Sequence, residues 1–517
     1  MKPFKNIYVI IGFMLFALFF GAGNLIYPAF LGIYSGSNLT LAILGFCLTG
    51  VTLPLLGVVA VAYSGASDVE DFARPVSRHY ALLFSIALYL SIGPFFAIPR
   101  TGATSFSIGI QPILGDSIGV KIAYGLLFFG LSYILAIKPS KIADRIGKYL
   151  TPALLIILAI LVIASFVKPA GDIGTAYNAA NDISNAFKDV PFVAGLIQGY
   201  GTMDALASLA FAIIVINASK QHGAKNQSEV ALLTFKSGII ATILLALIYI
   251  FVSRIGATSQ SLFTLTNGQF TFNGAAIDGG NVLGQAAYFY LGNTGRAVLA
   301  AAIFLACLTT ATGLITACAE YFHKLQPKLS HVAWASIFTL IALFFYFGGL
   351  SELIKWSLPV LYLLYPLTVV IVLLVLLAKF FNNSPIVYRL TIGFTVIPAL
   401  YDAFSTLSTM TGLFTLPTSF VEFFTTIVPF GQFSMGWISF ALVGFILSIF
   451  ITKVKKSIDN MITNKTHQTQ MSLVCYVILF SKQTNAFLDV FAIFNFINKA
   501  NSIVCIADNT FTLIVCG

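Results

Sequence analysis

The chain has 517 residues, of which 58% are hydrophobic and only 9% charged. Soluble proteins carry roughly a quarter charged residues, so this composition excludes an ordinary soluble domain. Apolar residues at this density need the lipid bilayer as their solvent. The formal net charge of +10 lies in short basic clusters between long uncharged runs, which is typical of loops at an anionic membrane surface and argues against nucleic-acid binding.

The hydrophobic runs predict an all-α membrane protein with about twelve transmembrane helices of about 20 residues each. In chain order, the predicted spans lie near residues 7–31, 39–63, 80–110, 120–137, 149–167, 190–217, 231–253, 296–319, 332–349, 354–379, 388–408 and 434–452. The first run is not a removable signal peptide, because the uncharged stretch between Lys5 and Asp68 is long enough for two spans.

The basic residues alternate between the loops on the two sides of the predicted spans. One set of loops holds most of them: Lys2, Lys5, Arg74, Arg78, Lys138, Lys141, Arg145, Lys148, Lys220, Lys225, Lys236, Lys324, Lys328, Lys379, Arg389, Lys453, Lys455 and Lys456. The positive-inside rule places this set, and with it the N-terminus, in the cytoplasm of a multi-pass protein of the cell membrane. The cysteines form no Cys-x-x-Cys pair, so neither a disulfide framework nor a zinc site is indicated.

Glycines interrupt the first and sixth predicted spans in their middle, in the run GAGN at 21–24 and the run GYGTMD at 199–204. Close helix packing is one explanation of such glycines. However, these two spans cross the membrane in opposite directions, and corresponding breaks of this kind are the signature of inverted-topology repeats. The predicted fold is therefore a 5+5 inverted repeat with discontinuous helices 1 and 6, with repeats at about 7–167 and 190–379 and extra helices at about 388–452.

These elements form a predicted polytopic transporter domain at residues 1–456. The C-terminal extension at 457–517 contains apolar runs that are too short to span a membrane, and we assign it no role.

An unwound turn in the membrane frees backbone polar groups, which must line a cavity or meet a ligand. The second half of the first span begins near Gly23 and Asn24, and the positive end of its dipole suits a carboxylate. The carbonyl groups that end the first half of the sixth span, near Gly199 and Tyr200, suit an ammonium group or a metal cation. An amino acid carries both charged groups, so it is the expected small-molecule substrate.

Several polar residues within the spans each have more than one interpretation. Asp204 is either a cation or proton site, or a partner for the substrate ammonium, or a cap of the second half-helix. Thr309 and Thr310, with the Ala306 carbonyl, either bind a sodium ion through hard oxygen ligands or bond back to their own helix. Arg100 either gates the outer vestibule by pairing with an acid or snorkels to the interface.

Three stretches, at 12–28, 93–105 and 199–208, resemble the bacterial branched-chain amino acid carriers of the BrnQ type. The resemblance covers about residues 1–456 and implies the leucine-transporter fold. It also implies uptake of leucine, isoleucine and valine by alternating access, coupled to sodium or protons. The same fold carrying another neutral amino acid is the alternative.

By similarity to that fold, the substrate-binding residues are expected to be Gly21, Ala22, Gly23, Gly199, Tyr200, Gly201, Thr202 and Asp204. The expected sodium ligands are Ala17, Phe20, Ala306, Thr309 and Thr310. Asn24 matches the asparagine of a second sodium site seen in some members of the fold.

Other classes of membrane protein fit the sequence less well. A channel needs a repeated filter or a ring of like charges, and an enzyme needs a motif such as HExxH or GxSxG; neither occurs here. The phosphate-binding loop of an ATP-driven pump is also missing. We therefore expect no enzymatic activity, no cofactor beyond the coupling ion and no obligatory protein partner.

Overall fold

The computed structural model describes residues 7–21, 23–137, 149–179, 185–221, 223–463, 504–505 and 514–515. Two compact units are distinguished along the chain, Met1–Phe445 and Ile446–Gly517. All the packing reported below lies within the first unit. The predicted extension at 457–517 lies largely outside the described residues. Its described elements are the end of α19 (Gly436–Thr463) and an antiparallel pair, β4 (Val504–Cys505) and β5 (Ile514–Val515).

Both predicted helix breaks are present. In the first, α1 (Ile7–Phe19) ends before α2 (Gly23–Ser35) begins. In the second, α11 (Pro191–Tyr200) and α12 (Asp204–Gln221) meet at a bend of 43°. Met203, between them, has a φ of 65°, a left-handed conformation that an unbranched residue adopts only when its surroundings hold it there. The discontinuous helices 1 and 6 are therefore confirmed.

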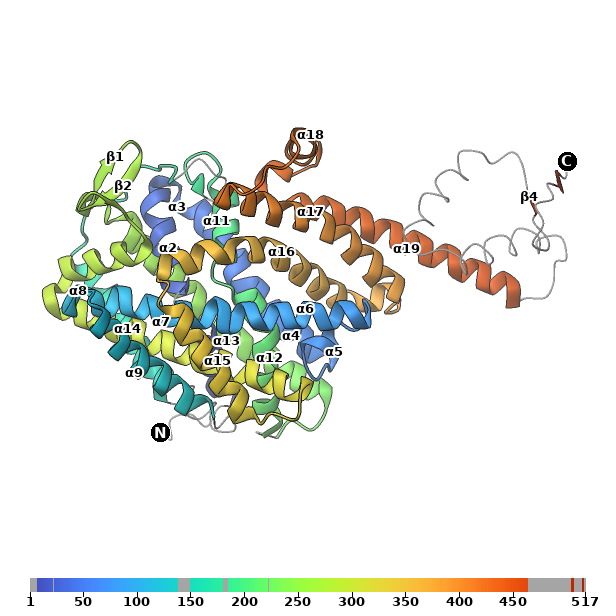
Figure 1. Ribbon diagram of the computed structural model, residues 1–517, viewed down its shortest axis with the longest axis horizontal. Coiled ribbons are helices and arrows are strands. Elements are labelled where there is room, and N and C mark those ends of the chain that lie inside the picture. Colours follow the sequence, from blue (N-terminus) through green and yellow to red (C-terminus); the bar gives the residue numbers. More distant parts are fainter. Residues whose placement is uncertain are drawn as a thin grey trace. The chain divides into compact units, whose positions relative to one another are not determined.

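The other helices follow the order of the predicted spans. They are α3 (Leu39–Cys47), α4 (Leu53–Ser64), α5 (Val69–Ala73), α6 (Arg78–Leu90), α7 (Ala97–Thr104), α8 (Gln111–Leu114), α9 (Ile118–Ala136), α10 (Thr151–Val167), α13 (Gln227–Ala257), α14 (Gly279–Leu325), α15 (His331–Tyr346), α16 (Leu350–Leu376), α17 (Pro385–Thr411) and α18 (Thr418–Glu422). Wide helical turns at Leu48–Thr52, Ser91–Phe95 and Ser105–Ile110 continue α3 into α4 and α6 through α7 into α8. Figure 1 shows α6, α7 and α8 in one line.

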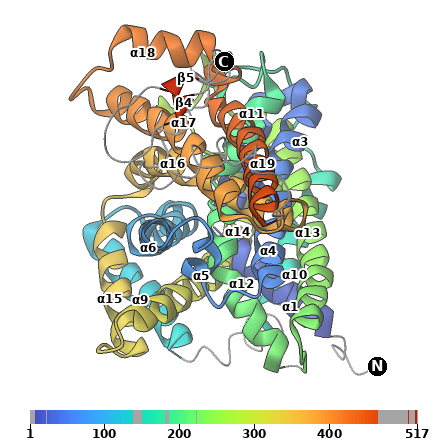
Figure 2. The same cartoon turned by 90° about the vertical axis from the view of Figure 1, so that its right-hand side faces the viewer.

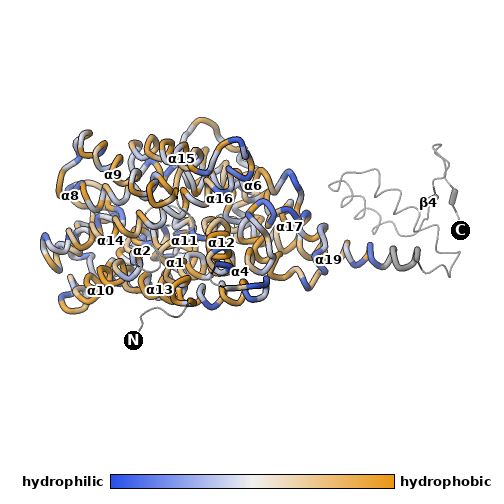
Figure 3. The backbone as a smooth tube through the Cα atoms, turned by 90° about the horizontal axis from the view of Figure 1, so that it is seen from below, coloured by the Kyte–Doolittle hydropathy of each residue, from blue (hydrophilic) through white to orange (hydrophobic). Residues whose placement is uncertain are grey.

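The helices have the length and composition that a bilayer requires. Among the described residues, eight helices are long and apolar enough to cross a membrane, or nine if the bent pair α11 and α12 counts as one span. The apolar helices α1, α10 and α15 are shorter. Helices occupy every predicted range, and hydrophobic residues run along them (Figure 3). The all-helical membrane fold is confirmed, and the number of about twelve spans stays a prediction.

Packing sorts the helices around the breaks into two groups. In the first, α13 packs on α1, α2 and α4, while α12 packs on α4 and α11 on α3. In the second, α14 packs on α7, α9 and α15, and α15 also packs on α7 and α9. The two groups contact each other where α14 meets α1, α2 and α12. Figure 2 shows α1 and α13 on one side and α9 and α15 on the other. We name these the α13 group and the α14 group.

Glycines bring the backbones of α2 and α13 close together. A β-carbon on Gly32 would lie 2.0 Å from the Ser253 carbonyl oxygen, and one on Gly256 would lie 2.3 Å from the Ala29 carbonyl oxygen. No larger residue fits at either position without moving a backbone, and small residues serve in this way at helix contacts in membranes. This contact fixes the second half of the first broken helix against the α13 group.

The loop between α13 and α14 contains a small antiparallel sheet of β1 (Thr264–Thr266), β2 (Gln269–Phe272) and β3 (Ala275–Ala276). Phe270 is 3% exposed and packs edge-on against Tyr34 and Tyr177, and its N–H donates to the Tyr34 hydroxyl at 3.1 Å. The sheet therefore lies against the end of α2. The hydrophobic runs do not predict it, because its strands are shorter than the alternation that identifies a strand.

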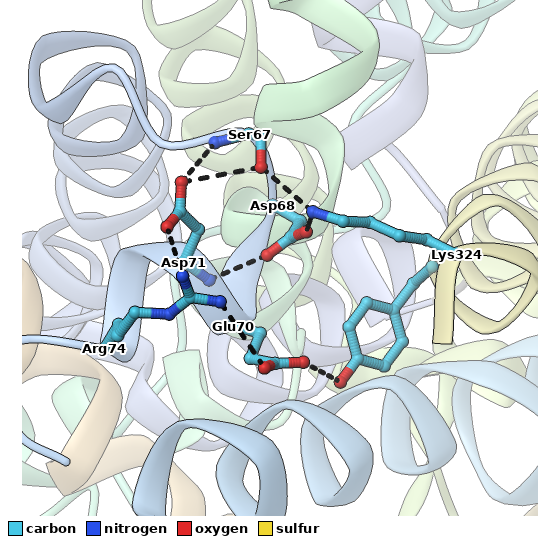
Figure 4. Close-up of polar contacts among 7 residues, drawn as sticks. Ser67, Asp68, Glu70, Asp71, Arg74 and Lys324 are labelled. Carbon is cyan, nitrogen blue, oxygen red and sulfur yellow. Dashed lines mark hydrogen bonds and ion pairs between the residues drawn. The ribbon is translucent and has the colours of Figure 1, made fainter. Parts of the chain in front are cut away.

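A polar network joins the turn before α5 to the end of α14. Figure 4 shows its residues, Ser67, Asp68, Glu70, Asp71, Arg74 and Lys324. The Lys324 ammonium pairs with the Asp68 carboxylate, and the Tyr321 hydroxyl donates to Glu70 at 3.4 Å. Asp68 also caps α5 by accepting the Asp71 N–H at 2.7 Å. The network thereby ties the connection between the two helix groups to the α14 group.

Candidate functional site

A cavity lies between the two helix groups, at the level of both breaks. The α13 group contributes polar and apolar lining residues next to the breaks, and the α14 group contributes residues from α7 and α14. The lining residues are Leu18, Phe19, Gly21, Gly23, Asn24, Ile92, Ala97, Arg100, Thr101, Thr202, Met203, Asp204, Ala207, Phe211, Thr310 and Leu314. Relative movement of the groups would therefore change this cavity directly.

Asn24 is the centre of a buried polar cluster on the α13-group side of the cavity. Its Oδ1 accepts the N–H of Gly21 at 2.9 Å, and its Nδ2 donates to both the Asp204 carboxylate and the Tyr249 hydroxyl. Tyr249, on α13, in turn donates to Asp204 at 3.2 Å. The carboxylate is thus bound by side chains from two other helices, while the Asp204 N–H donates to the Thr202 hydroxyl at 3.3 Å.

Arg100 lies on the opposite side of the cavity, in α7. Its Nη1 donates to the Gly201 carbonyl at 2.7 Å and its Nη2 to the Thr202 carbonyl at 3.2 Å, and its guanidinium lies 5.9 Å from the centre of the Tyr27 ring. The residue is 4% exposed, so its position does not match snorkelling to an interface. Its contacts bridge the two helix groups through the unwound turn of the sixth span.

The predicted sodium ligands lie where α1 meets α14. The Thr309 hydroxyl donates to the Ala17 carbonyl at 2.8 Å and to the Ala306 carbonyl at 2.9 Å. Three oxygen atoms therefore converge, one hydroxyl and two carbonyls, and hard oxygen donors of this kind suit a sodium ion. These residues fit the expected ion.

The other two expected sodium ligands lie close by but differ in their contacts. The Thr310 hydroxyl donates to the Leu18 carbonyl at 3.0 Å, so it contacts the next residue along α1. Phe20 continues the last turn of α1, since its N–H donates to the Phe16 carbonyl at 2.7 Å. Their participation stays a prediction.

The expected substrate residues fall into three sets. Gly21, Gly23, Thr202 and Asp204 line the cavity, whereas Ala22 lies outside the described residues. Of the remaining three, Gly199 and Tyr200 are buried in helix contacts, and Gly201 packs on Tyr27 while its carbonyl accepts a hydrogen bond from Arg100.

Those helix contacts use the groups that were expected to face the substrate. The Gly199 carbonyl accepts the Thr202 hydroxyl at 2.9 Å, and a β-carbon on Gly199 would lie 1.9 Å from the Thr49 hydroxyl oxygen. The Tyr200 ring stacks on Tyr365 with 4.2 Å between ring centres. A β-carbon on Gly201 would lie 2.3 Å from the Tyr27 ring. Close packing thus accounts for both glycines of this break.

Tyr249, Met203 and Phe211 are site residues that were not predicted from the sequence. Tyr249 is fully buried and lies in the middle of a long apolar helix, where a lone hydroxyl group is the signal that identifies it. Met203 and Phe211 are apolar residues in an apolar helix, so only their positions in the structure show that they line the cavity.

Comparison with known proteins gives consistent matches over nearly the whole chain. A family model described as branched-chain amino acid transport protein matches residues 5–455. The branched-chain amino acid permease BraB of Bacillus subtilis (strain 168) is 39% identical over 457 residues, covering 87% of this chain and 97% of that protein. The branched-chain amino acid permease BrnQ of Lactobacillus delbrueckii subsp. lactis is 39% identical over 436 residues, covering 82% and 92%.

A solved structure has the same fold. It is Mhp1, a nucleobase-cation-symport-1 family transporter in a closed conformation with bromovinylhydantoin bound, and it covers 86% of this chain and 93% of its own. The TM-score is 0.54 and the sequence identity 12%, so the likeness concerns the fold alone. The leucine-transporter-like fold expected from the sequence is thereby confirmed.

Proposed function

Because the chain belongs to the family of branched-chain amino acid transport proteins, we propose that it takes up leucine, isoleucine and valine by symport with a cation. The proteins of this family are transporters and not enzymes. The relatives named above are branched-chain amino acid permeases, which supports the substrate class. The alternative substrate is another neutral amino acid.

The cavity lining supports an amino acid with a branched aliphatic side chain. Leu18, Phe19, Phe211 and Leu314 give one part of the cavity an apolar surface, which would bury such a side chain at roughly 25 cal/mol per Å² of apolar area. Asn24, Arg100 and Asp204 supply the polar part. A cavity with both parts in contact suits a molecule that is charged at one end and apolar at the other.

The two helix groups support alternating access. The cavity lies between them, so a rigid-body movement of one group against the other would open it first to one side of the membrane and then to the other. We place the N-terminus in the cytoplasm of a bacterial cell membrane on the charge bias of the loops. The transporter domain is taken as residues 1–456, and residues 457–517 as an extension of unknown role.

The observation that carries the cation coupling is the convergence of Ala17, Ala306 and Thr309 between α1 and α14. A sodium ion held there would contact both helix groups and would favour the conformation in which α1 meets α14. Its binding would thereby be linked to the state of the cavity. Protons are the alternative coupling ion.

The test is uptake of labelled leucine into proteoliposomes under an imposed sodium or proton gradient. We expect a sodium gradient to drive uptake, and the Thr309→Ala variant to need at least about tenfold more sodium for half-maximal uptake, because a hydroxyl ligand is lost. Thr312→Ala is the matched control, since the Thr312 hydroxyl only donates to the Leu308 carbonyl of its own helix at 2.7 Å.

Each of three results would contradict a different part of the proposal. Uptake that responds to neither the sodium gradient nor the proton gradient would exclude symport. Uptake driven only by protons, with Thr309→Ala equal to the wild type, would remove the sodium site. Saturating competition by a small neutral amino acid such as alanine, with none by isoleucine or valine, would replace the substrate class.

A further inference from the structure

Arg100 carries a buried charge without an acidic partner. The residue is 4% exposed, and none of the ion pairs found in the described parts of the chain includes it. A cation buried at membrane depth is costly unless polar groups compensate for its lost hydration. The direct hydrogen bonds of Arg100 go to neutral backbone carbonyls. Asp204 lines the same cavity but makes no ion pair with it, so the guanidinium has no carboxylate of the described residues in direct contact and can bind one that enters the cavity.

The two carbonyls that hold Arg100 belong to the unwound turn of the sixth span. Gly201 and Thr202 lie between α11 and α12, and the guanidinium bonds their carbonyl oxygens at 2.7 Å and 3.2 Å. Backbone carbonyls freed by a helix break are the groups that would otherwise accept a substrate ammonium. Arg100 therefore occupies, in this conformation, the acceptors that a cationic ligand would use.

The guanidinium also lies beside the start of α2. A β-carbon on Gly23 would be 3.3 Å from Arg100 Nη2, and Gly23, Asn24 and Arg100 line the same cavity. The N–H groups and the positive dipole end of this helix favour an anion. An α-carboxylate at this position would therefore meet a helix N-terminus and a planar guanidinium together, and the guanidinium binds carboxylates with two parallel hydrogen bonds.

We propose that Arg100 binds the carboxylate of the substrate, and that the substrate enters by exchanging with the contacts that Arg100 makes to the Gly201 and Thr202 carbonyls. In the exchange, the guanidinium turns from the two carbonyls to the carboxylate, and the ammonium of the same molecule takes the vacated carbonyls. This inference rests on the proposed function, because it assigns the charged end of an amino-acid substrate.

The exchange predicts that both charged groups must be present on one molecule. A ligand with a carboxylate alone would draw Arg100 away and leave two buried carbonyls unbonded. A ligand with an ammonium alone would have to displace the guanidinium and leave it unbonded. Sites built from buried polar groups discriminate strongly against ligands that leave such groups unpaired.

The test compares leucine with leucinamide, which keeps the ammonium and the side chain but lacks the negative charge. Inhibition of labelled leucine uptake and direct binding are measured in wild-type protein and in Arg100→Gln, Arg100→Lys and Arg296→Gln. Arg296 is the matched control, because its guanidinium stacks on the Tyr288 ring at 4.0 Å and does not line the cavity. A second comparison uses 4-methylpentanoate, which lacks the ammonium.

We expect the wild type and Arg296→Gln to prefer leucine over leucinamide by about 100-fold or more. In Arg100→Gln this preference should fall below about tenfold, through weaker binding of leucine and not of leucinamide, and Arg100→Lys should lie between, since it keeps the charge without the planar fork. 4-Methylpentanoate should compete at least about 100-fold more weakly than leucine with the wild type.

An unchanged preference in Arg100→Gln, with wild-type uptake intact, would overturn this inference and leave the proposed function standing. Loss of binding of both leucine and leucinamide in both Arg100 variants would also overturn it, because leucinamide binding should not need the guanidinium. A wild type that takes up no branched-chain amino acid would overturn the proposed function and this inference with it.

Discussion

A single amide, that of Asn24, joins both broken helices. Its oxygen accepts the Gly21 N–H at the break of the first span, and its nitrogen donates to Asp204 at the start of α12 and to Tyr249 on α13. Each contact satisfies a group that lipid could not satisfy, and buried networks of this kind are costly to interrupt. The Asn24 side chain and the tyrosine that orients it therefore contribute to positioning α2 relative to α12.

Replacing Tyr249 by Phe tests this dependence. The change removes the donor to Asp204 and the acceptor for Asn24 without changing the ring, so two buried polar groups lose a partner at a cost of about 1–3 kcal/mol. We expect a melting temperature several degrees lower in detergent and a lower rate of leucine uptake. Differential scanning fluorimetry and proteoliposome uptake measure the two effects.

Tyr89→Phe is the control for Tyr249→Phe. Tyr89 is equally buried, but its hydroxyl has no hydrogen-bond partner among the described residues. We expect less than half the loss of stability in this variant. Equal losses of stability in the two variants would show that the hydrogen bonds of Tyr249 to Asn24 and Asp204 add no stability.

The residues of this cluster differ in how far the sequence predicts them. Asn24 and Asp204 are visible because a polar residue beside a glycine break in an apolar run is rare and has a physical meaning. Tyr249 is not, because its partners are separated from it by 225 and 45 residues along the chain and only the fold brings them together. Arg100 is visible as a buried charge, but its carbonyl partners exist only once the sixth span has unwound.

Among the helices at the site, α2 and α13 make a close backbone contact. Gly32 faces the Ser253 carbonyl and Gly256 faces the Ala29 carbonyl, so the two backbones touch at both positions. Lipid tails are as apolar as leucine, so this packing is a main source of attraction between helices in a membrane. The glycine pair therefore places α2, and with it Gly23 and Asn24, at the cavity.

Gly32→Ala is expected to separate these helices. Its β-carbon would lie 2.0 Å from the Ser253 carbonyl oxygen, so a backbone must move, and overpacking of this kind costs about 1–3 kcal/mol. A shift of α2 also displaces Asn24, so uptake should fall by more than the loss of folded protein explains. Thermal unfolding and uptake per folded transporter are the measurements.

Gly130→Ala on α9 is the matched control, because nothing lies within 4 Å of its β-carbon position. In a membrane helix this change should leave stability and uptake near the wild-type values. If Gly32→Ala behaved in the same way, the close approach of α2 and α13 would not be what positions the site.

The broken helices were predictable from the sequence, whereas the small sheet was not, because only the helices carry a signal in their own residues. Long apolar runs and glycine breaks carry their own signal, so the discontinuous helices at Gly21–Gly23 and Gly199–Gly201 follow from the sequence. The sheet β1 to β3 has strands of two to four residues and is held by Phe270 against Tyr34, which is distant in sequence. Its stability comes from that contact and not from its own pattern.

In the compact unit as a whole, the two helix groups meet at the cavity and are also joined at the turn before α5. This turn leads from α4, in the α13 group, to α6, which continues into α7 of the α14 group. Lys324 of α14 pairs with Asp68 there, and Gln227 of α13 donates to the Tyr63 carbonyl at 2.7 Å (Figure 4 shows the Lys324 contact). The connection thus contacts both groups, so its polar bonds contribute to holding the observed arrangement.

A double-mutant cycle of Asp68→Asn and Lys324→Gln measures that contribution. Asparagine keeps the cap of α5, because it is as good a cap as aspartate, so the cycle isolates the ion pair. Asp68 is only 6% exposed, which strengthens the pair, but Lys324 is 59% exposed, which screens it. We therefore expect a coupling free energy of about 0.5–1 kcal/mol from thermal unfolding, with exposed Lys328→Gln giving no coupling to Asp68→Asn. Strictly additive losses would mean that the ion pair of Asp68 and Lys324 shown in Figure 4 does not contribute to holding the two groups in the observed arrangement.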